Sequence, residues 1–242
     1  MKLILNGCSN PGLSYTEKYK MDIIRLYDYF LNLCPKEIYE YTKLQDLIED
    51  QINIDGSEIR MVIPFLFKIG ILSEENAIRG GKKLRKIIIN DSLFTKEGLC
   101  FAQFLKIDKN KNSFNDVQKE IVDRIFHKFG LMQFEKLRNG ENLIYDDLLV
   151  FLKKYKTIDK NEFFILTDSR KENKLNLLED LVQKYRNHEV DGIEIKHDPN
   201  AFQYVTKLLL QLGILKKNQE GFLVLTNLAN MYFKEDNYEF KQ

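Results

Sequence analysis

The sequence lacks the features of a membrane-spanning or secreted protein. No stretch of its 242 residues approaches the roughly 18 apolar residues that cross a bilayer. The opening MKLILNG has only a short apolar run after Lys2, which is too short for a signal peptide. We therefore expect a cytoplasmic protein without a membrane partner.

Cysteine and histidine are scarce, which argues against a disulfide framework and against a metal site. The three cysteines are far apart, odd in number and set among apolar residues, so we interpret them as reduced, mostly structural thiols. They are Cys8, Cys34 and Cys100. The three histidines, His127, His188 and His197, show no metal-ligand spacing. A phosphate-binding glycine motif and a nucleophile elbow are also absent. We expect no cofactor and no complete catalytic site in this chain.

An excess of charge of one sign is missing too. The chain has 37 Lys and Arg against 36 Asp and Glu, for a net charge of +1. Attraction to nucleic acid therefore cannot be argued from net charge, and any DNA contact must come from a local basic patch. With 44% apolar residues, the length suits two domains of about 100 residues better than one.

The most informative feature that is present is an internal repeat. FLFKIGIL, from Phe65 to Leu72, recurs as LLLQLGIL, from Leu208 to Leu215, with the glycines in register. After each copy comes a strand-like run and then a threonine, Thr95 or Thr226, that opens a helix. The loop between these features is longer in the first copy, as is typical of a repeated supersecondary module.

Each copy is predicted to form helices, a short hairpin and a further helix. In the first copy, Asp55 followed by Glu58 is a capping-box start, and Pro64 predicts a kink or break in the helix that follows. The predicted elements are helices over Met21–Cys34, Leu44–Ile52 and Asp55–Ile69, and strands over Ile71–Glu74 and Lys86–Asn90.

The second copy follows the polar stretch Asp108–Ser113, which we interpret as an exposed linker. The predicted fold is mainly α with small β-hairpin wings, that is, tandem winged-helix (helix-turn-helix) domains over residues 1–110 and 111–242. The second domain is predicted to contain helices over Asn115–Phe129, Ile144–Tyr155, Asp159–Thr167 and Lys174–Arg186, a polar turn over Asp168–Asn173, a helix capped by Asp198 with Pro199 at its first position, and a hairpin over Ile214–Leu225.

The helix after Asp198 has two contrasting faces. Its apolar residues, from Phe202 to Leu212, recur at helical spacing and form one stripe. The opposite face carries Asn200, Gln203, Tyr204, Lys207 and Gln211. Asn, Gln and Lys can read base edges in the major groove. A solvated polar face is the alternative, but the third helix of a winged-helix unit is the usual reader.

A concentrated basic stretch, RGGKKLRK, lies in the predicted wing of the first copy. Its cations are Arg79, Lys82, Lys83, Arg85 and Lys86. No acid interrupts them, and two glycines allow close backbone approach, so the stretch suits phosphate groups. A solvated lysine-rich loop is the alternative. A weaker cluster of Arg170, Lys171 and Lys174 lies at a predicted helix start, where free N–H groups also favour phosphate.

One short motif raises the question of DNA cleavage. Metal-dependent nucleases of the common restriction type need an acidic residue followed by Glu-x-Lys on a strand. Glu194, Ile195 and Lys196 spell that triplet. It lies just before a helix cap and lacks surrounding apolar strands, so we do not predict a catalytic site from it.

The second half of the chain resembles a known family. The stretch FLKKYKTIDKNEFFILTDSRKENKLNLLEDLVQKYRN from Phe151, with DPNAFQYVTKLLLQLGIL after it, is similar to the recognition region of type IIS restriction and nicking endonucleases of the AlwI kind. The opening SNPGLSYTEKYKMDIIRLYDYF resembles the start of such enzymes, and more remotely of FokI. The resemblance implies reader helices over Ser57–Lys68 and Asn200–Gln211. In that family a separate magnesium-dependent nuclease domain follows; no catalytic residues of that domain have counterparts here.

These observations predict sequence-specific recognition of double-stranded DNA by the recognition domain or subunit of a restriction endonuclease. Arg60, Asn200, Gln203 and Lys207 are predicted to contact bases, with Ser57 and Lys68 on the first reader helix. The nuclease, with its magnesium, would be a separate domain or subunit. One alternative is a winged-helix protein-interaction subunit. Another is a transcriptional regulator or replication initiator, which would bind a palindromic site as a symmetric dimer.

Overall fold

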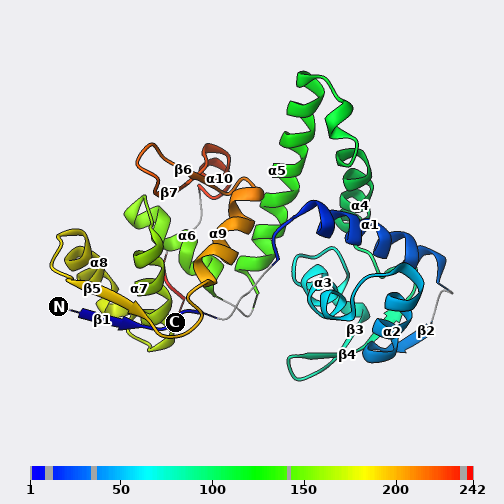
Figure 1. Cartoon of the computed structure of the whole chain (residues 1–242), viewed down its shortest axis with the longest axis horizontal. Coiled ribbons are helices and arrows are strands. Elements are labelled where there is room, and N and C mark those ends of the chain that lie inside the picture. The colour runs from blue at the N-terminus through cyan, green and yellow to red at the C-terminus, as the bar shows by residue number, and fades with distance from the viewer. Residues whose placement is uncertain (1, 9–12, 34–36, 141–142, 235–238, 242) are drawn as a thin grey trace. The chain divides into compact units, whose positions relative to one another are not determined.

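The computed structural model describes residues 2–8, 13–33, 37–140, 143–234 and 239–241; Cys34 lies outside them. The chain divides into two compact units. The amino-terminal unit is Leu13–Phe129, and the carboxy-terminal unit is Met1–Gly12 together with Gly130–Gln242. The fold is mainly helical with small sheets, as predicted (Figure 1). No helix in the described ranges has both the length and the apolar character needed to cross a membrane.

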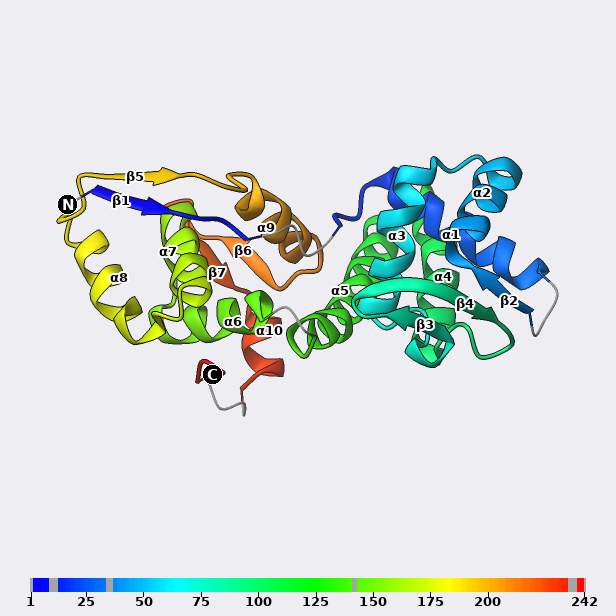
Figure 2. The same ribbon diagram turned by 90° about the horizontal axis from the view of Figure 1, so that it is seen from below.

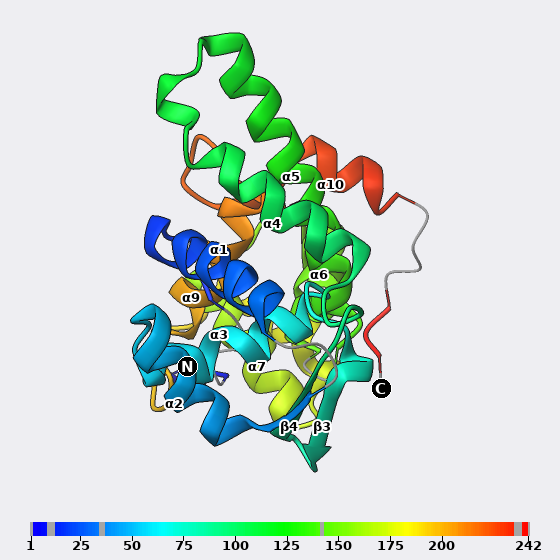
Figure 3. The same cartoon turned by 90° about the vertical axis from the view of Figure 1, so that its right-hand side faces the viewer.

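The amino-terminal unit combines helices α1 to α4 with a small antiparallel sheet of order β2-β4-β3. Strand β2 was not predicted, and it pairs with β4 through Tyr39 and Ile87. Strands β3 and β4 form a hairpin (Figure 3); β3 lies later in the sequence than the predicted first strand, whereas β4 overlaps the predicted second strand. The elements are α1 (Glu17–Asn32), β2 (Glu37–Glu40), α2 (Tyr41–Ile52), α3 (Gly56–Lys68), β3 (Ala77–Gly80), β4 (Lys83–Ile89) and α4 (Lys96–Asp108), with a short 3₁₀ turn over Glu74–Asn76.

Helix α3 begins where its capping residue predicts. The Asp55 carboxylate accepts a hydrogen bond from the Ser57 amide at 2.7 Å, but Glu58 forms an ion pair with Lys18, so its side chain does not complete a capping box. The helix continues through Pro64 to Lys68. The predicted break is therefore wrong: a proline removes a single N–H donor, and the buried face on either side of it holds the helix together.

Helix α5 (Asp116–Arg138) spans the division between the units. Its start is capped reciprocally by Asn115 and Gln118. Further along, Phe129 packs on Phe101 and Phe104, with ring centroids 5.2 and 5.5 Å apart. These aromatic contacts place the first half of α5 in the amino-terminal unit. The compact units therefore divide inside α5, rather than after residue 110 as the sequence suggested.

The predicted linker Asp108–Ser113 is mostly exposed, but its first residue belongs to α4 and is buried. Asp108 is buried and binds Lys20 at 2.7 Å. Lys111 forms an ion pair with Asp123 of α5, and Lys111–Ser113 is a 3₁₀ turn. Lys109, Asn110, Asn112 and Ser113 are exposed, so the predicted exposure of this stretch holds for the residues that follow α4.

The carboxy-terminal unit has the same order of elements with an insertion. A bridge joins Ile158 to Leu223 of the hairpin β6–β7, so the order is helix α6, an extended residue, helices α7 and α9, and a hairpin. Helix α8 and strand β5 are inserted between α7 and α9, and β5 pairs in parallel with β1 (Figure 2). The elements are β1 (Lys2–Leu5), α6 (Ile144–Tyr155), α7 (Lys160–Lys171), α8 (Leu178–Arg186), β5 (Gly192–Ile195), α9 (Ala201–Gln211), β6 (Leu215–Lys217), β7 (Leu223–Leu225) and α10 (Asn227–Tyr232).

Helices α7 and α9 have boundaries that differ from the prediction. The capping box of Asp159 and Glu162 is present with both hydrogen bonds, but α7 continues to Lys171. Residues 168–171 are thus helical and not part of a turn. Helix α9 begins at Ala201, because Asp198 has a positive φ of 49° and accepts the Ala201 amide through its backbone carbonyl instead of capping with its side chain.

Candidate nucleic-acid interface

The internal repeat corresponds to one local structure built twice. Helices α3 and α9 each end before a glycine in the left-handed region, Gly70 with φ 72° and Gly213 with φ 70°. The hydroxyl of Thr95 donates to the Gly70 carbonyl at 2.6 Å. The hydroxyl of Thr226 donates to the Gly213 carbonyl at 2.7 Å. The threonines and glycines of the repeat therefore hold equivalent positions.

The same threonines also start the helices that follow. Their hydroxyls accept the amides of Gly98 and Ala229, at 2.9 and 3.2 Å. Their own amides donate to the carbonyls of Ile71 and Ile214, at 3.1 and 3.0 Å. Each threonine thus connects the end of one helix to the start of the next. Helices α3 and α9 therefore end in equivalent junctions, one in each unit.

Helix α9 presents the predicted polar face. Its apolar stripe is buried at Val205, Leu208, Leu209 and Leu212, while Phe202 is half-buried. On the opposite side, Asn200, Gln203, Tyr204 and Lys207 are exposed, and Gln211 is half-buried. The helix that was predicted to read bases therefore carries hydrogen-bonding side chains on a solvent-accessible surface.

Helix α3 presents an equivalent face in the amino-terminal unit. Ser57, Arg60, Met61 and Lys68 are exposed, whereas the facing residues, such as Val62, are buried. The Ser57 hydroxyl donates to Asp55, and the bonds from Ser57 lower the pKa of that carboxyl. Arg60 and Lys68 are thus the charged groups on this surface, and Ser57 serves the helix start.

The basic stretch RGGKKLRK forms two strands and a tight turn rather than a loop. Arg79 lies on β3, and Lys83, Arg85 and Lys86 lie on β4; all are exposed. The turn at Gly81 has φ 62°, which favours glycine. A bulge between Ile78 and Arg79 shifts the register opposite Arg85. Pairing in the hairpin therefore positions Lys83, Arg85 and Lys86 along β4, while Lys82 lies in the turn.

Arg79 and Lys86 have acidic neighbours within the unit. Arg79 binds Glu74 with two N–O distances of 2.8 and 3.0 Å and lies over the Phe67 ring, 5.9 Å from its centroid. Lys86 lies 3.9 Å from Glu40. The stretch is therefore less positive than its sequence suggests, because Glu74 and Glu40 are brought to it by folding. Lys82, at the turn, and Lys83 and Arg85, on β4, are exposed.

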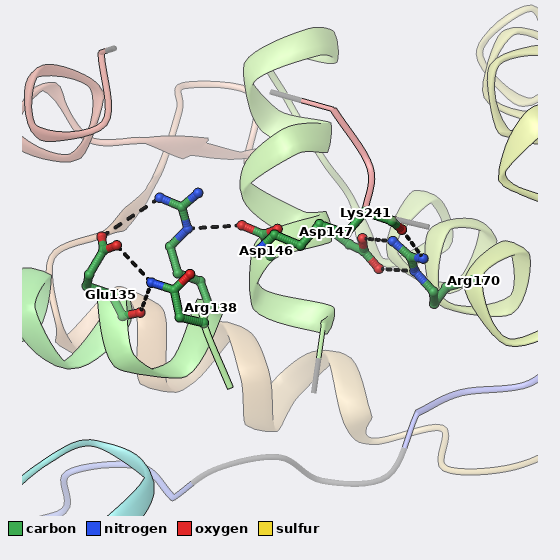
Figure 4. A network of polar contacts seen from close by, with 7 residues as sticks. Glu135, Arg138, Asp146, Asp147, Arg170 and Lys241 are labelled. Atoms are coloured by element: carbon green, nitrogen blue, oxygen red, sulfur yellow. Dashed lines mark hydrogen bonds and ion pairs between the residues drawn. The ribbon is translucent and has the colours of Figure 1, made fainter. Parts of the chain in front are cut away.

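Arg170 is not available as a phosphate contact in the way the sequence predicted. Its guanidinium binds Asp147 with two bonds, one of 2.7 Å, and the Lys241 carbonyl at 2.6 Å (Figure 4). The neighbouring Asp146 binds Arg138 at 3.0 Å and Lys241 at 3.0 Å. Burial raises the pKa of Asp147, and Arg170 opposes that rise. The carboxylates of Asp146 and Asp147 are buried, Arg170 is half-buried and Lys241 is exposed, and the network holds residue 241 against α6.

The other two residues of that cluster differ from Arg170. Lys171 is exposed in the last turn of α7, and Lys174 is exposed with Glu172 at 3.8 Å. The helix start predicted at Lys174 is a 3₁₀ turn, Leu175–Leu177, that precedes α8. The free N–H groups expected beside Lys174 therefore belong to a 3₁₀ turn that leads directly into α8.

The structure shows two further basic residues that were not predicted from the sequence. Lys216 and Lys217 are exposed on β6, in the hairpin that follows α9. They pair with Val224 and Leu223 of β7. The signal was present in the sequence, since LGIL of the second repeat copy runs directly into KK. Both units thus place lysines on the hairpin next to their exposed polar helix.

The Glu194 triplet has no nuclease geometry around it. Glu194 lies on β5 and binds Lys2 of β1 at 2.8 Å, and this pairing lowers the pKa of the carboxyl. Across the ranges that the structure describes, no group of three or more His, Cys, Asp or Glu side chains is arranged to hold a metal ion. Cys8 and Cys100 are free cysteines, and Cys100 is exposed rather than structural.

Comparison with protein-family models, with curated proteins and with solved structures gives no match for this chain.

Proposed function

We propose that this chain recognises double-stranded DNA sequence-specifically through two winged-helix modules. The observation that carries the proposal is the repeated arrangement of an exposed polar helix and a lysine-bearing hairpin, fixed in each unit by the same glycine and threonine. The order helix, strand, helix, helix, hairpin with the sheet order β2-β4-β3 supports a winged-helix interpretation of the amino-terminal unit. The bridge from Ile158 to β7 supports it for the other.

In this proposal, α3 and α9 lie in the major groove. That groove is wide enough for a helix, and its base edges pair with Arg, Asn and Gln side chains. Arg60, Asn200, Gln203 and Lys207 would contact bases. Lys82, Lys83 and Arg85 on one hairpin, and Lys216 and Lys217 on the other, would contact phosphates. Phosphate contacts supply most of the affinity and fix the register, while base contacts give the specificity.

We further propose that the chain is the recognition part of a type IIS restriction or nicking endonuclease. The sequence resemblance from Phe151 onward supports this. Cleavage would belong to a magnesium-dependent nuclease on another domain or subunit.

Charge reversal on the first hairpin tests the proposal. Lys83→Glu with Arg85→Glu is expected to weaken binding to a random-sequence duplex by at least about tenfold, because both cations would be lost and two acids added near phosphates. The slope of log K against log salt should become shallower by roughly 0.9 for each phosphate contact removed. Fluorescence anisotropy between about 50 and 200 mM salt measures both quantities.

The matched control is Arg124→Glu, a reversal at an exposed arginine of α5 whose partner is Glu120. It should leave the affinity within about twofold, since a single remote surface charge contributes little. Wild-type binding that is absent, or that does not change with salt, would contradict DNA recognition. Equal loss of affinity in both variants would assign the effect to overall charge.

A second candidate, a protein-interaction module, is favoured by one observation. Val117, Ile121 and Ile125 form an apolar stripe on α5 and are 66%, 52% and 40% exposed. Exposed apolar stripes of this kind mark contact surfaces. If this is the chain's role, Lys83→Glu with Arg85→Glu leaves its binding behaviour unchanged, while Ile121→Glu removes its partner.

A further inference from the structure

The two exposed helices can be compared residue by residue, because each is fixed at the same end. Beyond the glycine and threonine contacts, the amides of Ile71 and Ile214 donate to the carbonyls of Leu66 and Leu209, at 2.9 and 3.0 Å. A helix turns by a constant angle per residue. Residues at the same distance before Gly70 and Gly213 therefore point in equivalent directions within their own units.

The burial pattern supports this alignment. Val62 and Val205 are both buried at equivalent places, as are Leu66 and Leu209. Met61 and Tyr204, again equivalent, are 46% and 50% exposed. The aligned exposed pairs are Ser57 with Asn200, Arg60 with Gln203, and Met61 with Tyr204, while Lys68 is exposed and its counterpart Gln211 is half-buried.

The aligned side chains differ in the base that they can read. An arginine forms two hydrogen bonds with O6 and N7 of guanine, whereas a glutamine forms two with N6 and N7 of adenine. Arg60 and Gln203 occupy the same place, ten residues before the glycine, and both are exposed. Resting on the proposed function, we infer that Arg60 reads a guanine and Gln203 an adenine at equivalent positions of two different half-sites.

The consequence is a composite DNA site whose halves are not copies of each other. The structural repeat gives each half the same docking geometry, and the exposed face gives each half its own sequence. Met61 and Tyr204 strengthen the difference, since a thioether can contact a thymine methyl group while a phenol can also donate a hydrogen bond. One chain thus presents two different base-contacting helices, each held by the same kind of local structure.

Exchange of the two side chains tests this inference. Sites are selected from a pool of randomised duplexes with the wild-type chain, Arg60→Gln, Gln203→Arg and the double exchange. We expect Arg60→Gln to replace guanine by adenine at one position only, with a change in preference of about 10- to 100-fold. Gln203→Arg should make the opposite replacement at a position in the other half, and the double exchange should make both.

Two further variants separate specificity from affinity. Arg124→Gln makes the same chemical change at an exposed arginine of α5 and should select the wild-type site. If Arg60→Gln binds too weakly for selection, Gln203→Arg still reports, because it adds a positive charge that favours DNA.

The outcomes distinguish this inference from the proposed function. A wild-type chain that selects no duplex contradicts DNA recognition itself. A wild-type chain that selects a defined site, with Arg60→Gln and Gln203→Arg selecting that same site, overturns the base assignment and leaves DNA recognition standing. Replacements that fall at symmetric positions of a palindrome would show two copies reading one half each, which also overturns the inference.

Discussion

A single buried carboxylate gives the clearest prediction for the dependence of stability on pH. Asp22 of α1 is 2% exposed, and among the described residues nothing donates a hydrogen bond to its Oδ2. Burial raises its pKa, and Glu58 adds to the rise, while Arg25 at 3.6 Å and Lys18 oppose it. Its ionised form is therefore less stable in the folded chain than in the unfolded one.

The sign of the effect follows from proton linkage. Because the folded-state pKa of Asp22 lies above its unfolded value of 3.8, the folded state binds more protons between the two values, and stability falls as the pH rises through the folded pKa. Asp22→Asn should therefore be more stable than the wild type at pH 7. This gain should disappear below about pH 3.8, where both side chains are neutral.

Urea unfolding of both chains at several pH values measures this difference. Asp46→Asn, at an exposed aspartate of α2, is the control and should not show a pH-dependent gain. A loss of stability for Asp22→Asn at pH 7 would mean that the ion pair with Arg25 outweighs the cost of burying the charge.

Helix α4 allows intrinsic propensity and packing to be tested against each other. Alanine is about 1 kcal/mol more favourable than glycine inside a helix, so propensity alone predicts that Gly98→Ala stabilises the chain. However, a Cβ at Gly98 would lie 2.1 Å from the Ile71 carbonyl oxygen. Forcing extra atoms into such a contact costs about 1–3 kcal/mol.

We therefore expect Gly98→Ala to lower the free energy of unfolding by about 1–3 kcal/mol, measured by chemical denaturation. Gly192→Ala is the matched control, because a Cβ there meets nothing within 4 Å, and it should be neutral. The equivalent place in the carboxy-terminal unit is occupied by Ala229, which is buried. A stabilised Gly98→Ala chain would show that α4 shifts away from Ile71 at little cost.

Most helices were predicted from the sequence, whereas the strands were predicted less well. Helical periodicity, the threonine caps and the repeated Gly-Ile-Leu predicted most helices and the repeat itself, because these signals are local. Strand β2 was missed, since EIYE is short and three of its four residues are exposed; its pairing with β4 is a tertiary contact. The first strand of the hairpin was predicted too early in the sequence. Asn76, which is buried and donates to the Ile88 carbonyl at 2.9 Å, extends the connection before β3.

The candidate interface was also predicted only in part, because local sequence signals do not reveal contacts between elements. The exposed face of α9 follows from periodicity, whereas the residues of α3 were predicted from the family resemblance. The pairing of Arg170 with Asp147, and of Arg79 with Glu74, does not follow from periodicity, because each joins residues from different elements. Adjacent Asp146 and Asp147 in the apolar run IYDDLLVFL were the available signal: buried carboxylates need cationic partners.

At the scale of the whole chain, DNA binding is expected to depend on the linkage of the two modules, because the net charge of the chain is only +1. Neither module has a large excess of positive charge, so each alone should bind DNA weakly. Covalent linkage makes the second contact intramolecular, which can raise the affinity by about 10²–10⁴-fold over a single module.

We therefore expect a duplex with both half-sites to bind about 10²–10⁴-fold more tightly than one with either half randomised. Anisotropy titrations at fixed salt measure this ratio, and Gln203→Ala with Lys207→Ala should bind both duplexes with similar, weak affinity. If randomising the half-site of α9 leaves wild-type binding unchanged, only the amino-terminal unit contacts DNA.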